Sequence, residues 1–191
     1  DLDNLKHIND TYGHDWGDQY IHRTGRCLAE NTPNGTVVSR LSGDEFMLLF
    51  YGYSSQDQIR EKIRTLSSAM QKSVAILPSG NELRISISGG VAWYPASGTD
   101  MDTLKKYADF ALYQVKRTNK GHLEEFSMEI YQQEAQAAQL RRDFQQLLTE
   151  ERVYYVFQPI FSARTGKVMA YEALMRSDRE ALRSPATICL L

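Results

Sequence analysis

The stretch Arg40–Phe50, RLSGDEFMLLF, decides the fold of this chain. Its central Ser-Gly-Asp has the residues of a tight turn, and its last five residues read as a strand with alternating core positions. Together with Thr36–Ser39 before it, the stretch predicts a β-hairpin whose tip carries the adjacent carboxylates of Asp44 and Glu45. Acidic residues at turns are often only solvated, but a metal and phosphate site would need carboxylates at such a place.

The residues around this hairpin predict a mixture of helices and strands over residues 1–127. Ser55, with Gln58 three residues later, has the pattern of a helix N-cap with a capping box. The other predicted elements are a loop or interrupted helix over Asn9–Asp18, a helix over Tyr20–Glu30, one strand with a buried face over Leu83–Val91 and a helix over Asp102–Thr118.

The composition shifts after residue 127. Ser127–Glu151 is rich in Gln, Glu, Ala and Arg and has no Gly or Pro, so it predicts one long exposed helix that connects two parts of the protein. Val153–Phe161 and Lys167–Leu174 then read as two strands joined by a turn, which begins a second domain.

The bulk composition excludes several classes of protein. The chain has 191 residues, of which 42% are hydrophobic, and its 22 Lys and Arg against 24 Asp and Glu give a net charge of −2. A chain so close to neutral, without a basic run, has no electrostatic case for binding nucleic acid. No stretch is long and apolar enough for a membrane span, and no signal peptide is recognised. Cys27 and Cys189 lack metal-site spacing and are expected to be reduced thiols in a cytoplasmic protein.

Four separate blocks of the sequence resemble one family. DLDNLKHINDTYGHDWGD at residues 1–18, RLSGDEF at 40–46, ISISGGVAWYP at 85–95 and ADFALYQVKRTNKG at 108–121 are similar, in order, to the blocks of the GGDEF family. Members of that family are diguanylate cyclases, which join two GTP molecules into cyclic di-GMP. The resemblance implies an α+β fold over residues 1–127, with a ferredoxin-like, nucleotidyl-cyclase-like sheet flanked by helices.

The same resemblance implies a role for individual residues. Asp44 and Glu45 would be catalytic, and Mg²⁺ or Mn²⁺ would be bound by Asp1, Asp44 and the carbonyl of Leu2. Asn9 and Asp18 would read guanine, because a carboxylate accepts from guanine donors that adenine lacks. The other implied contacts to GTP are the amides of Asn4, Leu5 and Lys6 at a helix start, Ser42 and Gly43 in the turn, and the side chains of Lys116 and Lys120.

The chain departs from the family pattern at several positions. Ser42 replaces the first Gly of the motif, Leu5 replaces a usual Phe, and Lys120 stands where many members have Arg. The family's inhibitory Arg-x-x-Asp corresponds to Pro33–Thr36, so product feedback through that site is expected to be absent. The family also has a helix and a central strand before Asp1, and without them we expect unpaired sheet edges and exposed apolar surface.

A second resemblance covers the last part of the chain. YVFQPIFSARTGKVMAYEALMR at residues 155–176 is similar to the start of the EAL family, the cyclic di-GMP phosphodiesterases. It implies a helical linker over 128–138 and, over 139–191, the first hairpin of a truncated TIM-type barrel. Gln158 and Arg176 would contact phosphate and Glu172 would bind metal. The remaining ligands of that family lie beyond Leu191, so the expectation is a fragment of a tandem protein without phosphodiesterase activity of its own.

Two functions remain open from the sequence. The first is a Mg²⁺-dependent diguanylate cyclase that acts as a homodimer, since each domain holds one GTP and the two must meet. The alternative is a catalytically weak GTP-binding domain that regulates a downstream EAL phosphodiesterase. A scaffold without nucleotide binding is a third reading. The expected location is the cytoplasm, which leaves open a membrane anchor upstream of this segment.

Overall fold

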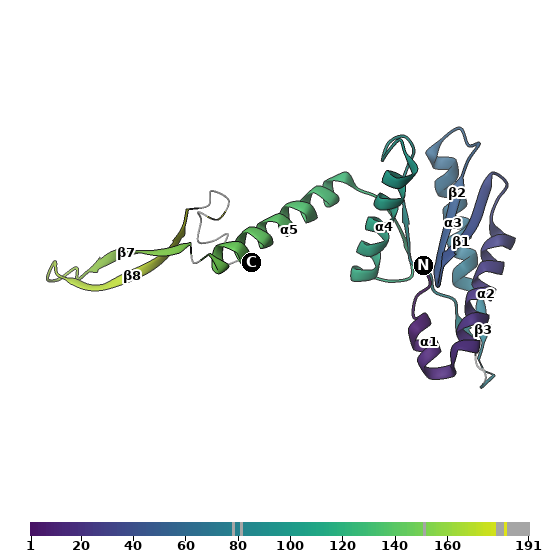
Figure 1. The fold of residues 1–191 in the computed structure, drawn as a ribbon, viewed down its shortest axis with the longest axis horizontal. Helices are drawn as coiled ribbons and strands as arrows, with labels where there is room; N and C mark the ends of the chain where they lie inside the picture. Colours follow the sequence, from purple (N-terminus) through teal and green to yellow (C-terminus); the bar gives the residue numbers. More distant parts are fainter. Residues whose placement is uncertain (78, 81, 151, 179–181, 183–191) are drawn as a thin grey trace. The chain divides into compact units, whose positions relative to one another are not determined.

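The structure is a computed structural model that describes residues 1–191 except 78, 81, 151, 179–181 and 183–191 (Figure 1). The chain divides into two compact units, Asp1–Ser127 and Met128–Leu191. Each unit is described by itself below. Cys189 lies outside the described residues, whereas Cys27 is a buried free thiol.

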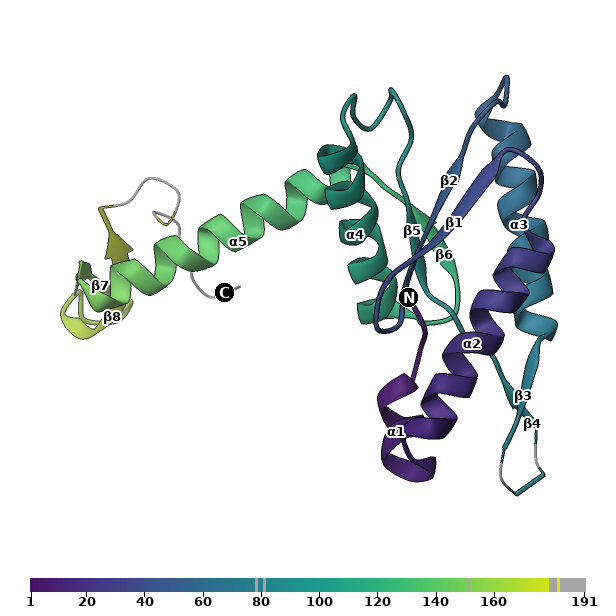
Figure 2. The ribbon, with the colours of Figure 1, turned by 45° about the vertical axis from the view of Figure 1, so that its right-hand side comes forward.

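The first unit places its strands between two layers of helices. Figures 1 and 2 show α4 on one side of the strands and α2 and α3 on the other. Its elements are α1 (Leu5–Tyr12), α2 (His14–Asn31), β1 (Thr36–Ser42), β2 (Glu45–Phe50), α3 (Gln56–Lys72), β3 (Val74–Ile76), β4 (Glu82–Arg84), β5 (Gly89–Val91), α4 (Met101–Thr118) and β6 (Leu123–Glu125).

The predicted hairpin is confirmed as the antiparallel pair β1 and β2. The ladder closes with Ser42 opposite Glu45, and the Arg40 guanidinium donates two hydrogen bonds, of 3.0 and 2.8 Å, to the carbonyl of Gly43. Gly43 has a φ of 40°, while Asn4 is the one non-glycine residue with positive φ among those described. Ser42 therefore does not need the backbone freedom of the glycine it replaces.

Local signals also set the helix boundaries. Of the loop and the interrupted helix predicted as alternatives over residues 9–18, the interrupted helix is confirmed. α1 ends at Tyr12, and its C-cap Gly13 has a φ of 87° and an N–H that donates to Asn9 O over 2.9 Å. At the start of α3, the Ser55 hydroxyl accepts from the N–H of Gln58, as predicted. The reciprocal bond differs, since the Gln58 side chain accepts from Ser54 instead of Ser55.

The prediction of one continuous strand over Leu83–Val91 is wrong. The segment has three different partners in turn: β4 pairs with β3, Ile87 forms an isolated bridge with Leu2, and β5 pairs in parallel with β6. Alternation reports which face of a segment is buried but carries no information on its partners.

Strand pairing in the first unit is limited. The described residues form only two-stranded ladders there, namely β1 with β2, β3 with β4, and β5 with β6. Val37 on β1 and Leu49 on β2 are 51% and 45% exposed. The β1–β2 ladder therefore carries exposed apolar side chains on both of its strands.

The core of this unit forms where α1, α2 and α3 pack on the strands. Its buried members are Leu2, Ile8, Tyr20, Ile21, Cys27, Leu28, Leu66, Met70, Ala75 and Ile85. Leu2 is 2% exposed, so the short segment that carries Asp1 and Asp3 is anchored by its apolar residue.

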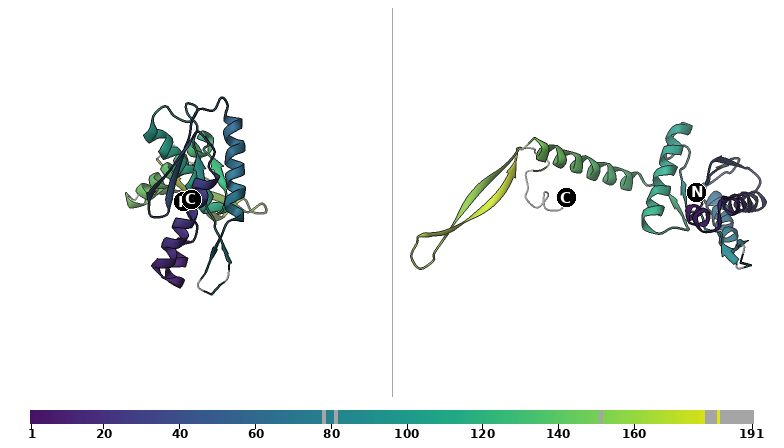
Figure 3. Two further views of the ribbon diagram at one scale, coloured as in Figure 1. Left: turned by 90° about the vertical axis from the view of Figure 1, so that its right-hand side faces the viewer. Right: turned by 60° about the horizontal axis from the view of Figure 1, so that its bottom comes forward.

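The second unit consists of α5 (Met128–Thr149), β7 (Val153–Phe161) and β8 (Val168–Ser177). The long helix is confirmed and runs without a break through residue 138, so the expected limit of the linker lies inside it. Figure 3 shows β7 and β8 as a twisted two-stranded ribbon. No helix in the described part of the chain has the length and apolar character that a membrane crossing requires.

Candidate functional site

The structure brings Asp1 and Asp44 to the same place. The N–H of Leu2 donates to Asp44 O over 3.1 Å, so the residue after Asp1 touches the tip of the β1–β2 hairpin. Burial and then Lys116 lower the pKa of the Asp1 amino group, whereas the carboxylates of Asp3, Asp44 and Glu45 act to raise it.

Three oxygen donors at this place match what a hard cation prefers. Neighbouring N–H and C=O groups of one strand residue leave on the same edge, so the Leu2 carbonyl faces the edge where its N–H meets Asp44. Carboxylates of Asp1 and Asp44 with one carbonyl are a donor set suited to Mg²⁺, which commonly takes one or two carboxylates. Among the described residues, no group of three His, Cys, Asp or Glu side chains is arranged to hold a metal ion.

The two lysines of the candidate site lie differently. Lys116, in the last turn of α4, forms an ion pair with Asp1, whose side chain is only 11% exposed. The Lys116 ammonium thus lies against a predicted metal ligand. Lys120 lies beyond the helix end, is exposed and has no ion pair among the described residues.

Glu45 is oriented by the residue opposite it in the hairpin. The Ser42 hydroxyl donates to a Glu45 carboxylate oxygen over 2.9 Å, and both residues are exposed. A serine at position 42 therefore supplies a hydroxyl group that the glycine of the family motif does not have.

The start of α1 provides backbone donors. Asn4 has φ 63° and its side chain makes no capping bond, so the first N–H groups of the helix lack a side-chain acceptor. The first bond of the helix is from Ile8 N to Asn4 O. The amides of Leu5 and Lys6 are thus oriented toward the N-terminal end, where anions are favoured.

Asn9 is placed against α2, beside the predicted partner Asp18. Its amide oxygen is shielded from solvent and has no hydrogen-bond partner among the described residues. A Cβ atom at Gly17 would lie 1.8 Å from this oxygen, so the glycine makes room for the Asn9 side chain. Asp18 follows directly and is exposed. The packing of α1 on α2 therefore places Asn9 against Gly17, the residue before Asp18.

Comparison with known proteins identifies the family. Residues 1–122 match the model of the diguanylate cyclase GGDEF domain. The chain belongs to the GGDEF family. Its 176-residue alignment with the cyclic di-GMP phosphodiesterase NbdA of Pseudomonas aeruginosa is 31% identical and covers 92% of this chain but 22% of that protein.

Further relatives support this assignment. The bifunctional diguanylate cyclase and cyclic di-GMP phosphodiesterase MucR of P. aeruginosa is 31% identical over 178 residues, which are 92% of this chain and 25% of MucR. This chain thus spans about a quarter of these relatives.

Solved structures confirm the fold of the GGDEF domain. The GGDEF domain of YfiN from P. aeruginosa has a TM-score of 0.63 at 28% identity, over 67% of this chain and 79% of that one. An EAL/GGDEF protein from M. capsulatus has a TM-score of 0.60 at 30% identity, over 66% and 81%. The α+β, nucleotidyl-cyclase-like fold is therefore shown for the first unit.

One buried group of the GGDEF domain was absent from the predicted site. Asp3 is 2% exposed and accepts hydrogen bonds from the hydroxyls of Ser86 and Ser88. The sequence signal was the alternation of polar and apolar residues in both segments, DLD and SIS, which puts the polar residues of each on one face. Sequence alone did not show that these faces meet.

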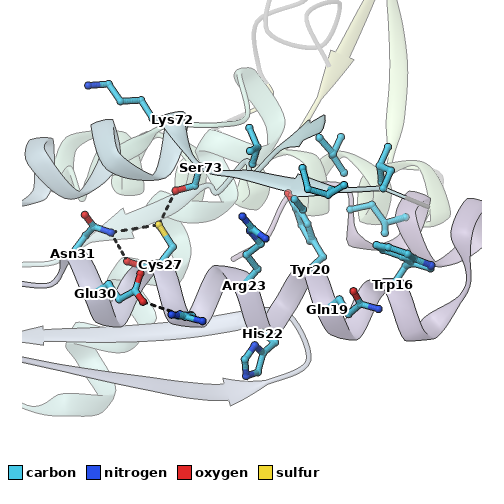
Figure 4. Close-up of a pocket in the computed structure, with 17 residues that line it drawn as sticks. Trp16, Gln19, Tyr20, His22, Arg23, Cys27, Glu30, Asn31, Lys72 and Ser73 are labelled. Carbon is cyan, nitrogen blue, oxygen red and sulfur yellow. Dashed lines mark hydrogen bonds and ion pairs between the residues drawn. The ribbon is translucent and has the colours of Figure 1, made fainter. Parts of the chain in front are cut away.

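A cavity beside α2 lies apart from the predicted site. A cavity of about 870 Å³ lies between α2 and β3, and Figure 4 shows Arg23 and Tyr20 of α2 directed toward the strand. None of the predicted GTP-binding residues is among its described lining residues. Tyr20 connects this cavity with the segment around Asp3, because its hydroxyl accepts from the N–H of Ser86 over 3.0 Å and the Ser86 hydroxyl donates to Asp3. Burial raises the pKa of Tyr20.

Proposed function

We propose that residues 1–127 act as a diguanylate cyclase, which condenses two GTP into cyclic di-GMP and releases pyrophosphate in bacterial second-messenger signalling. The observation that carries this proposal is the convergence of Asp1, the Leu2 carbonyl and Asp44 beside Lys116. Membership of the GGDEF family and the activity in MucR's name support it.

The acidic groups of this site would hold Mg²⁺ or Mn²⁺ through Asp1, Asp44 and the carbonyl of Leu2. Such an ion, when bound, lowers the cost of forming the attacking alkoxide and offsets the charge on the leaving pyrophosphate. Lys116 already places a positive charge on Asp1, so this carboxylate has a cation partner in the absence of metal.

Backbone and lysine donors would bind the triphosphate. The unpaired amides at the start of α1 favour anions, and those of Asn4, Leu5 and Lys6 would face the phosphate groups. Lys116 and Lys120 extend from the end of α4 and the loop after it, and their ammonium groups would neutralise phosphate charge. Gly43 at the hairpin tip has no side chain, and a Cβ there would meet nothing within 4 Å, so the phosphate can approach closely.

Asn9 and Asp18 would select guanine. The shielded amide oxygen of Asn9 is costly while it has no partner, on the order of 1–3 kcal/mol. A rotation of the amide that presents this oxygen to a ligand donor removes that cost. The exposed carboxylate of Asp18 can accept from guanine N1–H and its amino group, which adenine does not offer.

The reaction needs two copies of the domain. The 3′-oxygen of one GTP attacks the α-phosphorus of the other, the bond to pyrophosphate breaks, and Glu45 would accept the proton of the attacking hydroxyl. The Ser42 hydroxyl fixes one oxygen of Glu45 and leaves the other available. Repetition with the roles of the two nucleotides exchanged closes the ring, so the active form is a homodimer.

The second unit supports an additional proposal for residues 139–191, the beginning of an EAL-type domain. Alignment with NbdA and MucR covers 92% of this chain and so extends beyond the GGDEF domain. In the hairpin, Gln158 is paired with Glu172, and Arg176 lies four residues further along the same strand, so the three side chains share one face. The hypothesis of a catalytically weak regulatory domain is not favoured, because the backbone at Ser42 needs no glycine.

Turnover decides between catalysis and regulation. The full chain is incubated with GTP and Mg²⁺, and the products are separated by chromatography. We expect cyclic di-GMP and pyrophosphate, with a rate that rises faster than linearly with protein at low concentration. Asp44→Asn should abolish turnover, whereas Asp109→Asn, an exposed carboxylate on α4, should not. GTP that is bound but unchanged would contradict the cyclase and favour the regulatory hypothesis.

A further inference from the structure

A buried polar cluster lies behind the candidate metal-binding residues. Asp3 is 2% exposed and Ser88 is 1% exposed. The Ser86 hydroxyl donates to Asp3 Oδ2 over 2.7 Å, and the Ser88 hydroxyl donates to both carboxylate oxygens over 2.8 and 3.0 Å. No ion pair of Asp3 occurs among the described residues, and the hydroxyls of Ser86 and Ser88 are hydrogen-bond donors that satisfy its buried carboxyl group.

The cluster continues to the loop after α4. The N–H of Gly121 donates to the Ser88 hydroxyl oxygen over 3.1 Å. A hydroxyl has one proton and two lone pairs, so the proton that Ser88 gives to Asp3 leaves a lone pair for Gly121. Asp3 therefore fixes the direction of the Ser88 O–H bond, and this keeps a lone pair of the hydroxyl oxygen directed toward the Gly121 amide.

We propose that Asp3 is a positioning residue that holds the loop Asn119–Gly121, and through it Lys120, relative to Asp1. The assignment of Lys120 to phosphate rests on the proposed function. The chain of hydrogen bonds from Asp3 through Ser88 to Gly121, here called the relay, rests on the structure alone. Gly121 has a φ of 85° and its N–H is fixed by Ser88, so the residue before it starts from a defined backbone position. Lys120 has a long flexible side chain, and fixing its backbone reduces the entropy lost when it binds phosphate.

The two serines provide a matched comparison. Both hydroxyls donate to Asp3, but only that of Ser88 accepts from Gly121. Ser86→Ala removes one donor to the carboxylate and leaves the relay intact. Ser88→Ala removes one donor and the relay together. A purely structural role for Asp3 would make the two substitutions equivalent.

The first experiment measures the relay without nucleotide. Hydrogen exchange of the Gly121 amide is followed by NMR in the full chain and in Asp3→Asn, Ser86→Ala and Ser88→Ala, with the thermal midpoint as a check on folding. We expect exchange about tenfold faster in Asp3→Asn and Ser88→Ala, and near the wild-type rate in Ser86→Ala. Equal exchange in all four proteins would overturn the inference, even if the protein makes cyclic di-GMP.

The second experiment tests the consequence for phosphate binding. Calorimetry with GTP should show a dissociation constant about tenfold higher in Asp3→Asn, the loss expected for one charge-assisted hydrogen bond. In a Lys120→Ala background the same substitution should have little further effect, because the two residues act along one path. Independent losses that multiply would refute the path through Lys120. If the wild type binds no GTP, the proposed function fails, and the exchange rates still decide whether Asp3 positions the loop.

Discussion

Gly90 is where β5 lies closest to α4, and an added methyl group there has a calculable effect. A Cβ atom would lie 1.8 Å from Ala108 O and 2.5 Å from Leu112 N, which are the acceptor and the donor positions of one i→i−4 hydrogen bond in α4. Backbone atoms cannot rotate away, so α4 must move by roughly 1.6 Å to reach an ordinary contact of 3.4 Å. Gly90→Ala should therefore destabilise the unit by about 1–3 kcal/mol, as expected for overpacking.

Gly89→Ala is the matched control, because it makes the same change one residue earlier in the same strand. Its Cβ would lie 2.4 Å from Leu123 Cδ2, the end of a flexible side chain that can change rotamer. That adjustment should cost about 0.5–1.5 kcal/mol. Gly90→Ala should therefore be the more destabilising of the two substitutions.

Tryptophan fluorescence during urea unfolding is a suitable assay. The 2 tryptophans of the chain, Trp16 and Trp93, both lie in the first unit, so the signal does not include unfolding of the second. Because α4 carries Lys116, GTP binding should weaken in Gly90→Ala and change little in Gly89→Ala. Equal unfolding midpoints for the two variants would show that α4 is not held against β5 at this distance.

Two further predictions concern guanine selection and pH. Asp18→Ala should raise the KM for GTP and relax discrimination against ATP by about 1–3 kcal/mol, measured as the ratio of kcat/KM values, because a guanine donor pair loses its acceptor; an unchanged ratio would show that Asp18 does not read the base. Hydrogen bonds from Arg60, and secondarily from Trp93, lower the pKa of Glu125 in the folded state. The resulting stabilisation is fully present above the unfolded-state pKa of about 4.3 and is lost as the pH falls through the lower folded-state pKa. The free energy of unfolding, followed by tryptophan fluorescence, should therefore fall less steeply with decreasing pH in Glu125→Gln than in the wild type. The control Glu61→Gln should behave like the wild type.

Features that depend on neighbouring residues could be predicted from the sequence. The hairpin follows from a Ser-Gly-Asp turn between two apolar runs, and the break between α1 and α2 follows from Gly13. The cap of α3 follows from Ser55. In each case the residues that cause the feature lie within a few positions of it, so the pattern contains the whole interaction.

Features that depend on distant partners could not be predicted. Polar and apolar residues alternate over 83–91 as they would in one strand, but parts of the segment pair separately with β3, Leu2 and β6. Lys116 was expected to contact phosphate and is found on Asp1, a residue 115 positions away. The role of Asp3 depends on a hydroxyl 85 positions along the chain. Periodicity fixes which face a residue occupies and leaves open what that face meets.

The way the site is assembled makes ligand binding and stability inseparable. Asp1 and Leu2 belong to a short segment that is held by individual backbone hydrogen bonds. Asp44 lies at the tip of a two-stranded ladder, and Lys116 lies on α4. A two-stranded ladder alone is marginally stable, so these groups are held together mainly by contacts between the elements.

A ligand that bridges Asp1 and Asp44 must therefore stabilise the folded unit by mass action, by about 2.7 kcal/mol at a free concentration one hundred times its dissociation constant. GTP with Mg²⁺ should raise the urea midpoint of the tryptophan signal, and Asp44→Asn should remove most of that increase, while Asp109→Asn should retain it. An equal increase in wild type and Asp44→Asn would mean that the nucleotide binds elsewhere. The variant lacks one of the two carboxylates that the ligand would bridge, so binding at this site could not stabilise it to the same extent.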